Sequence, residues 1–154
     1  MTDDLEQMTL QAFCFVMESL AFMFPEPVEP EDFPRCAEPG VEANLTFSGP
    51  VAGEMRLSLC QETCAEVARN LMGLDFDTEV SQDQAHDALR ELVNVTCGEL
   101  LVRLTPKDAT FDLSVPYLQR FDSSGWEERA DGPDSLLFVI DGAPAVLQIE
   151  VEEG

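Results

Sequence analysis

The chain has 154 residues, 45% of them hydrophobic, and a formal net charge of −23 at pH 7. This length and apolar content predict a single folded domain over residues 1–154 and exclude a disordered chain. The eight basic residues are scattered, so nucleic acid and anionic membrane surfaces are excluded as partners because both would be repelled. A partner with a basic or metal-bearing face is favoured.

The N-terminal stretch predicts a helix over residues 4–24, capped at Thr2 or Asp3. Apolar residues surround this helix, which indicates burial on more than one side, against a sheet and, as one option, a second subunit. The stretch does not resemble a targeting segment, because it begins with acidic residues and carries Glu18 within the apolar run. That run is also shorter than the roughly 20 residues that span a bilayer, so we expect a cytoplasmic protein.

The next segments predict a connector, a hairpin and a short helix. Residues 25–40 hold five of the ten prolines and many carboxylates, which predicts an extended acidic connector with little regular structure. Strands are predicted over 41–47 and 52–60, joined by a turn at residues 48–50. A helix over 61–73 follows and ends at a glycine.

The longest predicted helix covers residues 81–104. Ser81 and Asp83 are its N-cap candidates, and Pro106 ends it. Apolar residues at helical spacing predict a buried face. The opposite face carries a line of residues at steps of four, three and four, made of Asp87, Glu91, Asn94 and Gly98.

The C-terminal third predicts strands. Residues 109–115 form one strand. Residues 117–134 form a loop or an irregular strand connection, in which Trp126 is a packing or subunit-contact residue. Residues 135–151 predict a hairpin around Asp141-Gly142. The whole order predicts an α+β fold with long helices packed on a largely antiparallel sheet. A long helix followed by a hairpin occurs twice, which indicates an internal pseudo-repeat.

An exposed asparagine in the middle of a helix is unfavourable for stability, because its side chain competes for backbone hydrogen bonds. One interpretation of Asp87, Glu91 and Asn94 is an ordinary solvated face that tolerates one poor residue. The other is a functional motif. The sequence pattern D-x-x-x-E-x-x-N resembles the signature of the CheC/CheX/FliY family of chemotaxis phosphatases. This resemblance favours the functional interpretation.

Segments on both sides of the motif also resemble the CheX branch of this family. They are Phe47-Ser48-Gly49, Gly53-Glu54-Met55, Leu71-Met72-Gly73 and Leu113-Ser114-Val115-Pro116. The resemblance runs from about Leu45 to Pro116. Two-site members of the family carry a second E-x-x-N on the first long helix. Here that helix has Glu18-x-x-Ala21, so the chain is similar to the single-motif CheX branch.

The resemblance implies a CheC-like fold and a phosphatase that hydrolyses the aspartyl phosphate of a CheY-like response regulator. By this resemblance Asn94 inserts into the phosphorylated site of the regulator and holds the attacking water. Glu91 pairs with a lysine of the regulator. The regulator carries Mg²⁺, so no cofactor of the chain's own is expected. The CheX branch further implies a homodimer with a sheet continued across the subunits.

The neighbours of Glu91 and Asn94 have open roles. Asp87 is expected to support Glu91 or to flank the interface. Arg90 either contacts carboxylates or phosphate of the regulator or forms an ion pair within the helix. Gly98 permits close approach of a partner or simply close helix packing. The alternative function is a non-catalytic module that docks a response regulator or a flagellar switch component, although such a surface has no need of the amide.

The five cysteines have irregular spacing and no secretion signal before them, which predicts reduced thiols. Cys60 and Cys64 lie one helical turn apart and hint at a metal. With one histidine, His86, and no second cysteine pair, we expect no metal site. His86 lies beside the acidic line, where it either titrates with pH or has no special role.

Overall fold

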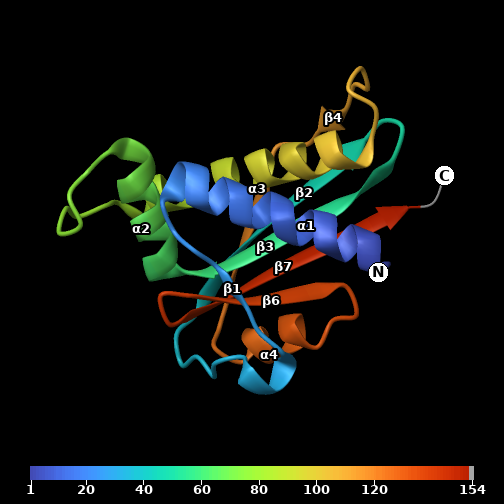
Figure 1. Cartoon of the computed structure of the whole chain (residues 1–154). Coiled ribbons are helices and arrows are strands. Elements are labelled where there is room, and N and C mark those ends of the chain that lie inside the picture. The colour runs from blue at the N-terminus through green and yellow to red at the C-terminus, as the bar shows by residue number, and fades with distance from the viewer. Residues whose placement is uncertain (153–154) are drawn as a thin grey trace.

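The computed structural model describes residues 1–152, so Glu153 and Gly154 of the expected domain lie outside the described residues. Its seven strands form one sheet in the order β1-β6-β7-β3-β2-β4, and β5 also pairs with β2. Every pairing is antiparallel. The long helices α1 and α3 and the shorter α2 lie on one face, and α4 lies on the other (Figure 1).

The helices and strands have these bounds: α1 Asp3–Val16, β1 Glu26–Pro27, β2 Gly40–Ser48, β3 Ala52–Cys60, α2 Gln61–Met72, α3 Gln82–Leu104, β4 Asp112–Leu113, β5 Tyr117–Phe121, α4 Gly125–Ala130, β6 Ser135–Ile140 and β7 Ala143–Glu152. A π-helical turn, Met17–Ala21, extends α1, and a 3-10 turn, Pro30–Asp32, lies in the connector. The predicted α+β class with an antiparallel sheet is confirmed.

The main core lies between the sheet and the three helices α1, α2 and α3. Alternate residues of each strand face it, as the period of two requires. Leu57 of β3 and Leu147 of β7 are paired neighbours with no exposed surface. Phe13 of α1 packs on Phe138 of β6 with ring centroids 4.9 Å apart. The contact between Phe13 and Phe138 packs α1 against the sheet.

A smaller cluster lies on the other face of the sheet, around Cys60, Trp126, Leu137 and Val146. Residues of α4 and of the connector cover it. The indole Nε1 of Trp126 donates a hydrogen bond to the carbonyl of Glu38 at 3.0 Å. Packing is therefore the role that the structure gives Trp126.

Local sequence signals are confirmed where they act within a few residues. Thr2 caps α1 by accepting from the Leu5 amide, and Ser81 with Gln84 forms a reciprocal capping box on α3. Asp141 and Gly142 both have positive φ, 50° and 83°, which is the backbone conformation of the favoured two-residue hairpin turn.

The helix-and-hairpin order occurs twice, as predicted. Helix α1 precedes the hairpin β2–β3, and α3 precedes the hairpin β6–β7. The two hairpins meet at the centre of the sheet, where β3 pairs with β7.

For residues 117–134 the loop alternative is wrong, and the segment is more regular than an irregular strand connection, because it contains β5 and α4. Leu118 and Phe121 are the half-buried members of β5, so the alternation in the sequence is weak, and the strand forms because β2 offers it a free edge. Helix α4 has six residues, too few to be stable alone. Its buried Trp126 and the ion pair of Arg129 with Glu42 hold it on the sheet.

Two other segments are shorter than predicted. In the segment 109–115, Asp112 and Leu113 are the residues that pair in the sheet. The helix predicted to reach residue 24 ends as an α-helix at Val16, and the chain turns at Phe22, which has φ 55°. Phe22 and Phe24 are 69% and 70% exposed, so the sheet does not bury the apolar end of this segment.

Within residues 1–152, none of the helices combines the length and the apolar content needed to cross a membrane.

Candidate functional site

The predicted line of residues lies on the outer side of α3. Asp87, Glu91 and Asn94 are exposed, and Gly98 is partly exposed. The rotation of the helix is fixed by its buried residues, which are Ala85, Ala88, Leu89, Leu92, Val93, Thr96, Cys97, Leu100 and Leu101. Because these residues pack against the sheet and the neighbouring helices, the exposed line is held on a rigid support (Figure 1).

Arg90 and Asp87 form an ion pair beside this line. Arg90 Nη1 donates to Asp87 Oδ1 at 2.7 Å. This is the intrahelical alternative considered for Arg90, and it directs Asp87 toward Arg90. The pair also offsets the repulsion between Asp87 and Glu91, like charges one helical turn apart.

Glu91 and Asn94 differ from their neighbours because their side chains have no polar partner among residues 1–152. Over residues 1–152, no hydrogen bond or ion pair involves the side chain of either residue. Their helical positions place a free carboxylate and a free amide three residues apart on one face. Within the described residues, the exposed side chain of Asn94 therefore makes no hydrogen bond that would stabilise the fold.

His86 lies on the flank of this line and contacts α2. Its Nε2 is 3.3 Å from Gln61 Oε1. Burial, followed by the charges of Arg120 and Arg90, lowers the pKa of His86, so the imidazole is neutral at pH 7. Strand β5 thus brings Arg120 to the start of α3. This proximity was not predicted, because residues 117–134 were expected to be a loop or an irregular strand connection.

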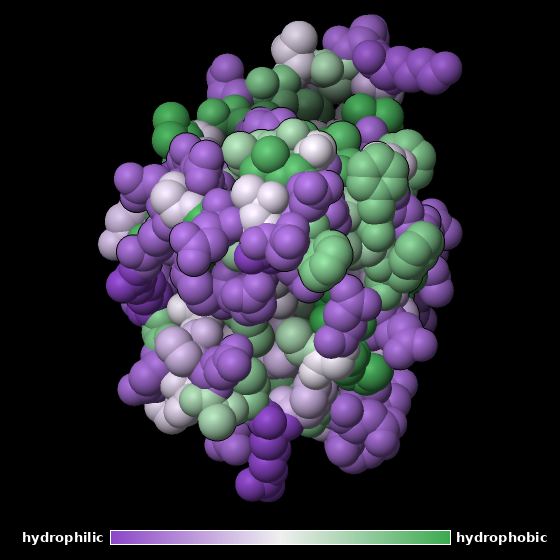
Figure 2. All heavy atoms as spheres, turned by 90° about the vertical axis from the view of Figure 1, so that its left-hand side faces the viewer, coloured by the Kyte–Doolittle hydropathy of each residue, from purple (hydrophilic) through white to green (hydrophobic). Residues whose placement is uncertain are grey.

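A shallow groove borders each end of the line. The first, about 240 Å³, is lined by Asp87 and Glu91 of α3 and by residues of α2 that include Met72. The second, about 300 Å³, is lined by Gly98, Leu101 and Val102 and by residues 105–113. On the molecular face shown in Figure 2, hydrophobic patches alternate with hydrophilic side chains. The line therefore runs between two partly apolar depressions.

Gly98 is not needed for packing within the chain. A Cβ added to it would meet nothing within 4 Å. The close-packing alternative for Gly98 therefore has no support from the residues around it. A glycine inside a helix destabilises it by roughly 0.5–1 kcal/mol relative to alanine. The stability of α3 therefore does not explain why residue 98 is a glycine.

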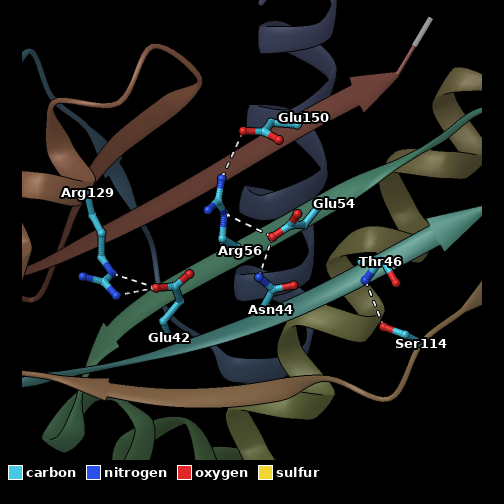
Figure 3. A network of polar contacts seen from close by, with 8 residues as sticks. All are labelled: Glu42, Asn44, Thr46, Glu54, Arg56, Ser114, Arg129 and Glu150. Carbon is cyan, nitrogen blue, oxygen red and sulfur yellow. Dashed lines mark hydrogen bonds and ion pairs between the residues drawn. The ribbon is translucent and has the colours of Figure 1, made fainter.

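A second polar network lies on the sheet face opposite the long helices (Figure 3). Arg56 pairs with Glu54 and Glu150, and Asn44 donates to Glu54. Arg129 pairs with Glu42 in the same view. Unlike Glu91, the carboxylates of this network have partners within the chain. We therefore assign the network a structural role.

The cysteines are placed differently from the pairing considered in the sequence. Cys64 faces the main core, whereas Cys60 faces the smaller cluster. The thiol opposite Cys60 is that of Cys36, with the two Sγ atoms 3.8 Å apart. In the described part of the chain, the one group of three potential metal ligands close together is Cys36, Glu38 and Cys60, away from α3.

The helices packed on an antiparallel sheet, with two helix-and-hairpin units, form a fold of the CheC-like class. The family model of the chemotaxis phosphatase CheX matches residues 41–129, which is more than half of the chain. The chain therefore belongs to the CheX family. A comparison of its sequence with curated proteins finds no match.

Solved structures share the fold over nearly the whole chain. The chemotaxis protein CheX from Vibrio vulnificus is 16% identical, with a TM-score of 0.69 and 97% of each chain covered. A CheC-like superfamily protein from Shewanella is 18% identical, with a TM-score of 0.71 and coverage of 99% and 100%. CheX in a complex with CheY, BeF3 and Mg²⁺ from Borrelia burgdorferi is 19% identical, with a TM-score of 0.64 and coverage of 99% and 100%.

Proposed function

We propose that this chain is a phosphatase that hydrolyses the aspartyl phosphate of a CheY-like response regulator, and that Asn94 positions the attacking water. The observation that carries the proposal is the exposed pair of Glu91 and Asn94, without partners among residues 1–152 and held on a helix whose other face is buried. Membership of the CheX family supports the choice of reaction class.

The reaction needs little from this chain. A phosphorylated regulator already holds an acyl phosphate, with Mg²⁺ and a lysine to neutralise the phosphoryl oxygens. Hydrolysis then requires a water held in line with the phosphorus. The amide of Asn94 can donate to that water or accept from it. Positioning of this kind supplies up to roughly 7–11 kcal/mol in model reactions, so no nucleophile or metal of the chain's own is required.

The other residues of the line serve the complex. Glu91 would be repelled by the phosphoryl group, so its role is to pair with the regulator's lysine and orient the two proteins. Gly98 lets the partner's backbone approach α3, since the space around it is open. Arg90 is partly exposed while paired with Asp87, so it can also reach carboxylates at the edge of the interface.

The structure of CheX from Borrelia burgdorferi with CheY, BeF3 and Mg²⁺ supports the choice of a CheY-like partner. We further propose that the chain is a homodimer with one site on each subunit. On one side the sheet ends at β4 and β5, and their outer edge is one place where the sheet can continue into a second copy.

The test measures loss of phosphate from phosphorylated CheY-like regulators of the source organism. It is run without this protein, with the wild-type chain, with Asn94→Ala and with Gln82→Ala. Gln82 is exposed on the same helix outside the line, so it controls for removal of an amide. Faster loss that disappears with Asn94→Ala and survives in Gln82→Ala supports the proposal.

The second candidate function is a non-catalytic module that docks a response regulator or a flagellar switch component. Binding without acceleration for every regulator tested would establish docking in place of catalysis. Acceleration that survives in Asn94→Ala would show that the site lies elsewhere, and Glu18 on the first long helix would be examined next.

A further inference from the structure

Two cysteines and a glutamate converge on the sheet face opposite α1 and α3. Cys60 is the last residue of β3, directly before α2, and Cys36 and Glu38 lie in the connector before β2. The two Sγ atoms are 3.8 Å apart, and both lie within 4.8 Å of a carboxylate oxygen of Glu38. We name these three residues the dithiol cluster.

The spacing within the dithiol cluster fits one small ion. Two thiolate sulfurs bound to a tetrahedral zinc ion at about 2.3 Å lie roughly 3.8 Å apart, which matches the distance between Cys36 and Cys60. A carboxylate oxygen on the same ion would lie about 3.6 Å from each sulfur. Glu38 is exposed, so rotation of its side chain is sufficient to bring the oxygen this close.

The backbone around Cys36 and Glu38 is already fixed. The amide of Glu38 donates to Cys36 Sγ at 3.4 Å. The carbonyl of Glu38 accepts from Trp126 Nε1 at 3.0 Å. Trp126 is 2% exposed and packs against Phe121 with centroids 4.9 Å apart. A buried aromatic residue therefore anchors the turn that presents two of the three ligands.

An ordinary buried thiol does not account for the position of Glu38. Its carboxylate turns toward two thiols, and no ion pair within residues 1–152 involves it.

We propose that Cys36, Glu38 and Cys60 bind a thiophilic divalent cation of the zinc class, with one coordination position left to water. Binding replaces two thiol protons, so one cation enters and two protons are released. The bound ion would fasten the connector to the end of β3. The proposal uses none of the residues of α3 and is independent of the phosphatase assignment.

The cluster could instead be an oxidisable pair, in which a disulfide such as oxidised glutathione accepts the electrons of both thiols and yields a Cys36–Cys60 bond and two reduced glutathiones. The carboxylate favours the metal, because it can act as a third ligand but has no part in a disulfide. The two interpretations predict different results in one set of measurements.

The test uses the full chain, reduced and freed of metal, titrated with Zn²⁺ in competition with a chromophoric chelator. One equivalent should bind. Cys36→Ser and Cys60→Ser should each lower the affinity by at least about 100-fold, because loss of an outer partner alone costs about 10–100-fold. Glu38→Gln should lower it less. Cys14→Ser is the matched control, because Cys14 is partly buried in α1, and its affinity should equal that of the wild type.

A second set of measurements distinguishes loss of a metal ligand from misfolding of a variant. Co²⁺ added to the wild-type chain should give the intense thiolate-to-metal absorption and the strong visible bands of a tetrahedral site. Each cysteine variant is compared only if its thermal unfolding without metal matches that of the wild type. Zinc affinity unchanged by Cys36→Ser would refute the proposal. So would a Cys36–Cys60 disulfide formed with oxidised glutathione in a chain that binds no Zn²⁺.

Discussion

Arg90 lies three residues after Asp87 on α3, and its Nη1 donates to Asp87 Oδ1 at 2.7 Å. The pair is solvent-exposed, with 39% of the Arg90 side chain and 75% of the Asp87 side chain accessible. The ion pair holds the guanidinium of Arg90 close to the surface of α3. Glu91, the next acidic residue of the exposed line, is left without a partner among residues 1–152. The unpaired carboxylate is the one assigned to the regulator's lysine.

Arg90→Ala should change stability little and complex formation more. Exposed helical ion pairs contribute about 0.3–0.5 kcal/mol, so the free energy of unfolding in urea should fall by no more than this. If Arg90 also contacts the regulator, its loss raises KM and leaves kcat unchanged, because uniform binding is removed. Steady-state kinetics at low and high salt check this, and a lowered kcat would contradict it.

Asn94 should show opposite effects on activity and stability. Asn94→Ala should reduce the acceleration of phosphate loss by about 100-fold or more, a size known for removal of one positioned donor. The same change should stabilise the chain by up to about 0.7 kcal/mol, because alanine is the better helix former. Phosphate-release kinetics and urea unfolding test the two effects, and an active, stabilised variant would show that the amide is dispensable.

Gly98→Ala separates a packing role from a docking role. The added methyl group meets no atom of the chain within 4 Å, so the variant should be more stable by roughly 0.5–1 kcal/mol. Affinity for the regulator should fall, because the methyl group occupies the partner's space. Gly73→Ala is the contrasting control. Gly73 ends α2 with φ 68°, so alanine there should destabilise the chain.

The sequence was sufficient for the elements whose signals are local. Of the two N-cap candidates Ser81 and Asp83, Ser81 begins α3, and Asp141-Gly142 forms the turn of the last hairpin, because caps and turns depend on a few adjacent residues. Helix α4 and strand β5 could not be predicted in this way. They form because the indole of Trp126 donates a hydrogen bond to the carbonyl of Glu38 and because β5 pairs with β2. Both interactions join segments that are far apart in the chain.

In the candidate site, too, local features could be predicted from the sequence, whereas contacts between distant segments could not. The exposed line on α3 follows from helical periodicity, since the buried positions between its members determine which side faces out. The pairing of Arg90 with Asp87 was open in the sequence, because both partners were within reach of other groups. The proximity of Arg120 to His86, and of Cys36 to Cys60, depends on strand pairing and could not be read from spacing.

His86 should make stability depend on pH. Burial, then Arg120 and Arg90, lower its pKa in the folded chain, so the unfolded chain binds the proton more tightly. Stability is therefore unaffected above the ordinary value of about 6.5, falls as the pH drops below it, and reaches its full loss below the folded pKa. Urea unfolding of the wild type and His86→Gln at pH 8 and pH 5.5, as round values spanning about 6.5, isolates this contribution from the carboxylates. An equal loss in both proteins would contradict the assignment.

Arg129 and Glu42 should contribute more to stability than the exposed pairs. Only 12% and 9% of their side chains are accessible, and Arg129 also lies 3.7 Å above the ring of Phe121. Arg129→Ala leaves a buried carboxylate without its partner, which costs about 3–5 kcal/mol. Glu42→Gln should cost less, because the amide oxygen can still accept from the guanidinium. Unfolding of both variants in urea should rank them in this order. If Arg129→Ala unfolds like the wild type, α4 is held by Trp126 alone.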